Sequence, residues 1–297
     1  MSTSRPAHYA SIFRPDLFAG QVHWVTGGGS GIGRCVAHEL AALGALVVIS
    51  GRRQEKLDAV KQEIEADGGV CETEAFDIRD DEAVKLHVAA VVARHGAVHG
   101  LVNNAGGQFP APLAEISKRG FDAVVNNNLT GGFLMMREVF VQAMRERGGG
   151  AIVNMTADFR NGMPGMGHSG AARAGMANLT QTAAFEWAHA NVRVNAVAPG
   201  WIASSGMDTY SGAMKAGIPL LKRHVPLRRL GVEAEVSAVI VFLLSPAAAF
   251  VTGVTVPIDG GAPLGNAARP SADHPGTPAF DGFHRAVVPA VLQAPTP

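Results

Sequence analysis

Cysteine, tyrosine and net charge are all scarce in this 297-residue chain. The two cysteines, Cys35 and Cys71, form neither a disulfide framework nor a metal-ligand spacing, which is typical of a protein in the reducing cytoplasm. The 25 basic residues balance 25 acidic ones, so no basic field would attract nucleic acid. No run reaches the roughly 18 apolar residues of a membrane span, and the N-terminus lacks the apolar core of a signal peptide. We therefore expect a cytoplasmic protein without a membrane span or a nucleic-acid partner.

Short apolar runs rich in valine and isoleucine alternate with longer helical patterns through most of the chain. Continuous apolar runs indicate strands that are covered on both faces, and alternating strands and helices imply parallel pairing with right-handed crossovers. The sequence therefore predicts an α/β fold, a Rossmann-type doubly wound parallel sheet of about seven strands flanked by helices. The expected strands are 22–25, 46–50, 72–76, 101–103, 151–155, 192–197 and 255–258. The expected helices are 32–43, 54–66, 81–95, 120–147, 169–189 and 232–244.

Two stretches break this alternation. Residues 201–230 follow the sixth expected strand, where ligands bind in open α/β sheets, so we expect a substrate lid there. Residues 263–297 are rich in proline and predict an irregular C-terminal tail. We expect residues 18–262 to form a single dinucleotide-binding and catalytic domain, preceded by an N-terminal extension over residues 1–17.

A glycine-rich loop follows the first expected strand and opens the first expected helix. Its spacing is G-x-x-x-G-x-G, in which the glycines permit a sharp turn and a close approach to a pyrophosphate. The helix that follows offers unpaired N–H groups and a favourable dipole to that anion. The position between strand and helix predicts a nicotinamide dinucleotide site. The loop residues expected to bind the cofactor are Thr26, Gly27, Ser30, Gly31, Ile32 and Gly33.

The residues after the second expected strand distinguish NADP(H) from NAD(H). An acid there would bind the adenosine ribose hydroxyls, but Gly51 stands in its place and Arg52 and Arg53 follow. Guanidinium groups suit a 2′-phosphate, so we expect NADP(H) rather than NAD(H), although both arginines also fit a solvated helix start. Further cofactor contacts are expected at the ends of later strands, from Asp77, Ile78, Asn103, Ala105, Gly106, Pro199, Gly200, Ile202 and Ser204.

Together with the segments 125–129, 152–155 and 259–261, these motifs resemble the short-chain dehydrogenase/reductase family over about residues 18–262. The resemblance implies a dinucleotide-dependent oxidoreductase that assembles as a homodimer or homotetramer. Members of the family use an asparagine, a serine, a tyrosine and a lysine in catalysis. Asn128 matches the asparagine, and Thr156 keeps a hydroxyl at the serine position.

The other two positions depart from the family pattern. Ser169 stands where the tyrosine is expected and Arg173 where the lysine is expected. Serine has no accessible anion near neutral pH and arginine does not release its proton, so the usual pair for alcohol–ketone chemistry is missing. Reduction of an activated C=C bond requires less, because hydroxyl or N–H donors can stabilise the charge that develops on a thioester oxygen. We expect Asn128, Thr156, Ser169 and Arg173 to be the catalytic set, with Arg173 also holding the cofactor ribose.

The run 167–175 resembles a subgroup of peroxisomal trans-2-enoyl-CoA reductases and bacterial proteins described as citronellol/citronellal dehydrogenases. The favoured function is NADPH-dependent reduction of an α,β-unsaturated acyl thioester, with an acyl-CoA or another hydrophobic small molecule as substrate. One alternative is a terpenoid alcohol dehydrogenase that uses His168 or Asp158 as its base. Another is a catalytically inactive NADPH-binding protein. Tyr210 lies in the expected lid, whose movement could bring its phenol to the substrate, but we interpret it as a packing or acyl-chain contact.

Overall fold

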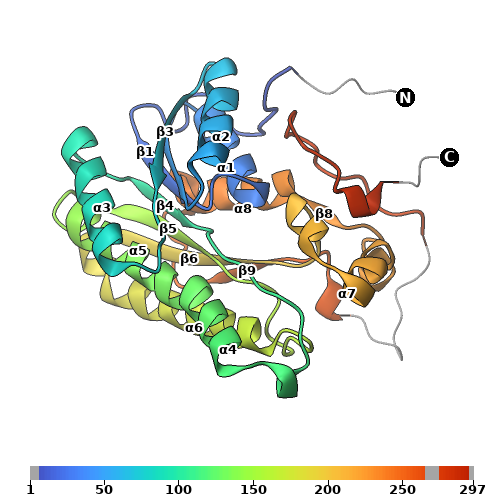
Figure 1. The fold of residues 1–297 in the computed structure, drawn as a ribbon. Helices are drawn as coiled ribbons and strands as arrows, with labels where there is room; N and C mark the ends of the chain where they lie inside the picture. Colours follow the sequence, from blue (N-terminus) through green and yellow to red (C-terminus); the bar gives the residue numbers. More distant parts are fainter. Residues whose placement is uncertain (1–6, 265–273, 294–297) are drawn as a thin grey trace.

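The computed structural model describes residues 7–264 and 274–293, and its centre is one parallel sheet (Figure 1). This sheet confirms the predicted fold class. The bounds of all seven strands differ from the prediction by no more than two residues; the third begins two residues earlier and ends one earlier. In sheet order the strands are β3 (Val70–Ala75), β2 (Leu46–Gly51), β1 (Val22–Thr26), β4 (Gly100–Asn103), β5 (Gly150–Met155), β6 (Val192–Pro199) and β9 (Thr255–Ile258).

The strand register sends alternate side chains to opposite faces of the sheet. Trp24 lies in register with Val48 and Leu101, and all three join the core on one face. The residues that follow them on the three strands join the core on the other face. The second face is covered by α1 (Gly31–Ala42), α2 (Gln54–Ala66) and α8 (Glu233–Leu244), and the first by α3 (Asp81–His95), α5 (Gly131–Val139) and α6 (Gly167–Glu186) (Figure 1).

The long helix expected over 120–147 is not uniform. It consists of α4 (Lys118–Val125), a π-helical turn (Asn126–Thr130), α5 and a second π-helical turn (Phe140–Met144). A π turn adds a residue to one helical turn and changes the direction of the side chains in it. Such an insertion does not alter the apolar pattern enough to be read from the sequence. It nevertheless determines the position of Asn128, which lies buried in the first π turn.

The expected lid contains several short elements. They are β7 (Ile202–Ala203), a 3₁₀ turn (Ser205–Thr209), α7 (Gly212–Gly217), a second 3₁₀ turn (Ile218–His224) and β8 (Gly231–Val232). The strands β7 and β8 pair in parallel and so bring the two ends of this segment together. No helix in the described ranges is both long and apolar enough to cross a bilayer.

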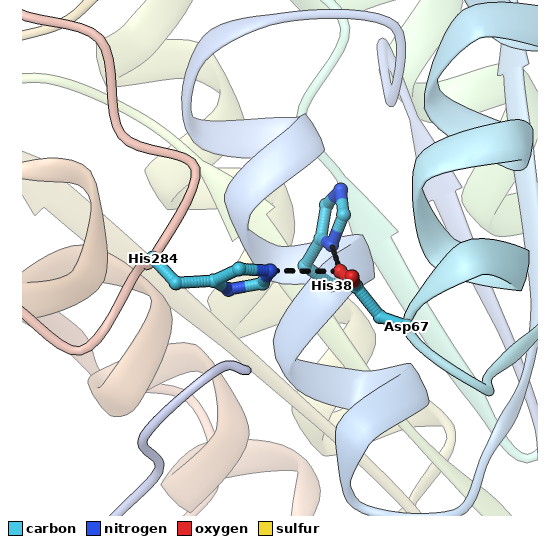
Figure 2. A group of neighbouring side chains, drawn as sticks. All are labelled: His38, Asp67 and His284. Carbon is cyan, nitrogen blue, oxygen red and sulfur yellow. Dashed lines mark hydrogen bonds and ion pairs between the residues drawn. The ribbon is translucent and has the colours of Figure 1, made fainter. Parts of the chain in front are cut away.

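The C-terminal segment is anchored to α1 and α2, far from it in sequence. Figure 2 shows His284 and His38 meeting at the carboxylate of Asp67, where His284 Nε2 lies 2.8 Å and His38 Nδ1 3.4 Å from Asp67 Oδ2. Arg285 donates to both carboxylate oxygens, at 2.9 and 2.5 Å. The ring of Phe283 is fully buried beside Tyr9 of the N-terminal segment. Residues 1–6, 265–273 and 294–297 of the expected extension and tail lie outside the described residues.

This anchor predicts a dependence of stability on acid. The hydrogen bonds from Arg285 hold the pKa of Asp67 at about 2, below its ordinary value of 3.8. A depressed pKa contributes stability that is present above the unfolded value and is lost as the pH falls toward the folded one. We therefore expect Asp67→Asn to lower the free energy of unfolding by about 1 kcal/mol at neutral pH, a value that allows for solvent screening. The difference should disappear as the pH falls from about 5 to about 2.

Chemical denaturation of both proteins across this pH range measures the difference. Asp16→Asn is the matched control, because Asp16 and its partner Arg14 are both more than 70% exposed and such pairs contribute little. A difference between Asp67→Asn and the natural protein that stays constant down to the acid limit would contradict the role of the ionised carboxylate.

Candidate functional site

A cavity of about 550 Å³ lies at the carboxyl ends of the central strands, where an open α/β sheet binds its ligands. Its wall contains most of the residues singled out from the sequence and several residues of the lid. The predicted site residues that line it are Gly27, Ser30, Gly31, Ile32, Arg52, Arg53, Asp77, Ile78, Ala105, Gly106, Thr156, Arg173, Pro199, Gly200, Ile202 and Ser204. The predicted residues outside the lining are Thr26, Gly33, Asn103, Asn128 and Ser169.

The glycine-rich loop forms one wall, and its shape requires glycine. Gly27 and Gly31 have φ values of 66° and 57°, in the left-handed region. A Cβ on Gly33 would lie 2.4 Å from the carbonyl oxygen of Gly27, so α1 can approach the loop only without a side chain there. The first turn of α1 has neither a side-chain cap from Ser30 nor an acidic residue. Its N–H groups and its dipole are therefore available to a pyrophosphate.

Thr26 and Asn103 lie behind this wall and shape it. Thr26 Oγ1 accepts hydrogen bonds from the N–H groups of Asn104 and Ala105, both at 2.9 Å. Asn104 Nδ2 donates to the carbonyl oxygen of Thr26 at 2.9 Å. Asn103 Nδ2 donates to the carbonyl oxygen of Gly132 at 2.6 Å, so it ties β4 to the start of α5. The side chains of Thr26 and Asn103 thus hold the ends of β1 and β4 in place.

Three cations line one end of the cavity. Arg52 and Arg53 are exposed there, and Lys56 on α2 joins them. Lys56 was missed in the sequence because a lysine in the first turns of an amphipathic helix is ordinary; only the fold places it beside the glycine loop. Asp77 lies at the same end, where hydrogen bonds from Arg79 lower its pKa and keep it an acceptor.

Asn128 is buried in the first π turn and all its polar atoms bind protein. Its Nδ2 donates to the carbonyl oxygens of Gly107 and Val124, at 2.6 and 2.8 Å, and its Oδ1 accepts from the N–H of Gly107 at 3.1 Å. A Cβ on Gly106 would lie 2.5 Å from that Oδ1. Asn128 therefore acts on the cavity through the loop it clamps.

Arg173 places a buried positive charge at the cavity wall. Its Nη1 donates to the carbonyl oxygen of Met155 at 2.7 Å, while its buried Nε has no partner among the described residues. Burial lowers the pKa of Arg173 to about 10, so the guanidinium remains charged at neutral pH. No described acid forms an ion pair with it, and a buried cation of this kind favours ligands that accept hydrogen bonds or carry negative charge.

The two hydroxyl groups of the expected catalytic set already donate within the protein. Thr156 lines the cavity, and its Oγ1 donates to the carbonyl oxygen of Val197 at 2.7 Å. Ser169 is fully buried on α6, and its hydroxyl donates to Gln108 Oε1 at 2.5 Å. The structure thus brings Ser169 to the site through Gln108, a residue that does line the cavity.

Gln108 connects this buried serine to the lid. Its Nε2 donates to the phenol oxygen of Tyr210 at 3.2 Å, and Tyr210 also lines the cavity. The sequence contained no signal for this contact, since the two residues are 102 positions apart. The two bases considered for alcohol chemistry, His168 and Asp158, are not among the cavity-lining residues. His168 is fully buried, accepts the N–H of Ser169 at Nδ1 and packs against Phe109.

The known proteins that this chain resembles are described as reductases and dehydrogenases. A family model described as enoyl-(acyl carrier protein) reductase matches residues 27–263. A probable 2,4-dienoyl-CoA reductase of Bacillus subtilis is 34% identical over 80% of this chain and 94% of its own. A peroxisomal 2,4-dienoyl-CoA reductase of Danio rerio is 35% identical over 87% of each chain. The solved structure of a citronellol catabolism dehydrogenase of Pseudomonas aeruginosa PAO1 is 61% identical over 86% of this chain and 99% of its own, with a TM-score of 0.78.

Proposed function

Since this chain belongs to the short-chain dehydrogenase/reductase family and is an oxidoreductase, we propose that it uses NADPH to reduce the C=C bond of an α,β-unsaturated acyl thioester. The observation that carries this proposal is the cavity wall at α6. On that helix Arg173 lines the cavity and Ser169 lies buried behind Gln108, in place of an ammonium and a phenol, so the pair that interconverts alcohols and ketones is absent from it. The dienoyl-CoA reductases among the relatives agree with this chemistry.

The residues that line the cavity offer suitable groups for each part of a dinucleotide. The loop Thr26–Gly33 and the free N–H groups of α1 would bind the pyrophosphate. Asp77 and Ile78 would contact the adenine, and Arg173 the nicotinamide ribose. Arg52, Arg53 and Lys56 favour a 2′-phosphate, and therefore NADP(H), at the adenosine end. The segment from Pro199 to Ser204 would contact the nicotinamide. When bound, this cofactor supplies a hydride.

The residues at the other end suit a hydrophobic thioester. Met155, Met207 and Ile218 give this part of the wall an apolar character that can contact an acyl chain. Addition of a hydride to the β-carbon moves negative charge toward the α-carbon and the thioester oxygen. The positive charge of Arg173, in a site partly shielded from water, lowers the energy of that charge distribution. Asn128 holds the Gly106–Gly107 loop beside Arg173, so the donors keep their positions.

A second candidate is NADP⁺-dependent oxidation of a terpenoid alcohol. It is favoured by the 61% identity to a citronellol catabolism dehydrogenase. This reaction needs a group that accepts the alcohol proton. His168 and Asp158, the bases considered for it, lie outside the cavity lining, and this is why we place it second.

The purified protein distinguishes these functions directly. We expect crotonyl-CoA or decenoyl-CoA to deplete the absorbance of NADPH, with NADH at least about tenfold less effective. Arg52→Gln should raise the KM for NADPH about tenfold and leave that for NADH nearly unchanged. NADPH binding without turnover of any unsaturated thioester would contradict the first function. Reduction of NADP⁺ by citronellol would then support the second, and inactivity with both would leave a dinucleotide-binding protein.

A further inference from the structure

We propose that Tyr210 of the lid supplies the proton to the substrate, and that Gln108 and the buried Ser169 position its phenol. This inference rests on the proposed thioester reduction, in which each hydride that reaches the β-carbon must be accompanied by one proton at the α-carbon. Tyr210 would then perform from the lid what the missing tyrosine of α6 performs in related enzymes.

Ser169, Gln108 and Tyr210 are joined by two hydrogen bonds, and in both the donor is on the side of Ser169. Ser169 donates its hydroxyl proton to Gln108 Oε1, which fixes the amide so that Nε2 faces the lid. Nε2 then donates to the phenol oxygen of Tyr210. A phenol oxygen that accepts this bond keeps its own hydrogen for another acceptor. Since Tyr210 lines the cavity, a bound thioester is the acceptor within its reach.

Several other polar side chains that line the cavity are less suited to this transfer. The hydroxyl of Thr156 donates to Val197, and the guanidinium of Arg173 does not give up its proton. Arg52, Lys56 and Asp77 lie at the end of the cavity that suits adenosine. Among the described residues the second tyrosine, Tyr9, is buried against Glu39 and lies outside the cavity lining.

The transfer balances without a further reactant. The β-carbon receives the hydride of the reduced nicotinamide, and the electron pair of the C=C bond moves to the α-carbon. The O–H bond of Tyr210 breaks and its proton forms the new C–H bond at that carbon. Gln108 Nε2, which already donates to the phenol oxygen, stabilises the phenolate that remains. Water returns the proton to Tyr210 before the next turnover.

The position of Tyr210 is held from a second side. Asp208, two residues before it, accepts the N–H groups of Ala290 and Val291 at 3.0 Å each. The C-terminal segment, which is anchored beside α1 and α2 through Arg285, therefore also binds the lid (Figure 1). Gln108 and this segment together keep the phenol at the cavity.

The test compares Tyr210→Phe with Tyr9→Phe, the same change at the chain's only other tyrosine. We expect Tyr210→Phe to lower kcat for crotonyl-CoA about 100-fold, while the KM for the thioester and the Kd for NADPH change less than about threefold. Tyr9→Phe should leave kcat unchanged. Gln108→Met should lower kcat about tenfold with the same small change in KM, because it frees the phenol without removing it.

Reduction in heavy water adds a readout that does not depend on rate. A phenol held on one side of the substrate should deliver deuterium to one face of the α-carbon, whereas Tyr210→Phe should give product labelled on both faces by bulk water. Turnover by the natural protein with an unaltered rate and facial selectivity in Tyr210→Phe would overturn the role of Tyr210 alone. No turnover of any unsaturated thioester by the natural protein would overturn the proposed function, and this role with it.

Discussion

Replacement of Gly33 by alanine is expected to abolish NADPH binding at concentrations that saturate the natural protein. The added Cβ would lie 2.4 Å from the carbonyl oxygen of Gly27 and 2.5 Å from Asn104 Nδ2. The first of these atoms is backbone, so α1 must move away from the loop that we propose as the pyrophosphate site. We expect the Kd for NADPH to rise more than about 100-fold and the free energy of unfolding to fall by about 1–3 kcal/mol.

Fluorescence titration of NADPH and thermal denaturation measure both effects. Gly217→Ala is the matched control, because a Cβ there meets nothing within 4 Å and its φ lies outside the left-handed region. It should leave cofactor affinity unchanged. Near-natural NADPH affinity in Gly33→Ala would show that the glycine loop is not the pyrophosphate site.

Replacement of Arg173 by methionine is expected to lower kcat/KM for the thioester more than about 100-fold. Methionine fills a similar volume without charge, so the change removes the buried cation and leaves the carbonyl oxygen of Met155 without its donor. We also expect weaker NADPH binding, because the guanidinium would hold the ribose. Steady-state kinetics together with NADPH titration separate the two contributions.

Arg173→Lys tests whether charge or shape is required. A lysine keeps the positive charge but presents a compact ammonium instead of a fork. We expect it to restore NADPH affinity to within about tenfold of the natural protein, with a smaller recovery of kcat. Arg145→Met, at an exposed arginine paired with Glu146, controls for the loss of a charge. Full activity in Arg173→Met would contradict both roles.

The order and type of the main elements could be read from the sequence because local physics determines them. Continuous valine- and isoleucine-rich runs such as Val47–Ile49 are buried on both faces, and the helices between them carry apolar residues toward one of two cores. The structure departs from the prediction inside the long helix expected over 120–147. The π turn around Asn128 changes hydrogen bonding by one residue, and no periodic pattern records that change.

The cofactor half of the site was also accessible from local motifs. Sixteen of the predicted residues line one cavity because parallel strands end at a common edge of the sheet. Thr26 and Asn103, which were expected to bind the cofactor, lie outside the cavity lining, and their side chains hold strand ends in place. A residue's place in a motif does not state whether its side chain faces the cavity or the core.

The departure from the family pattern at Ser169 and Arg173 could be read from the sequence alone, because the residue types themselves show that the phenol and the ammonium are missing. The same applies to the glycine loop and to the two arginines that follow β2. The partner of Ser169 depended on the tertiary structure. Gln108 and Tyr210 meet only when the chain after β4 and the lid after β6 converge over one cavity. Contacts between such distant segments depend on how the whole core packs, and no local pattern encodes them.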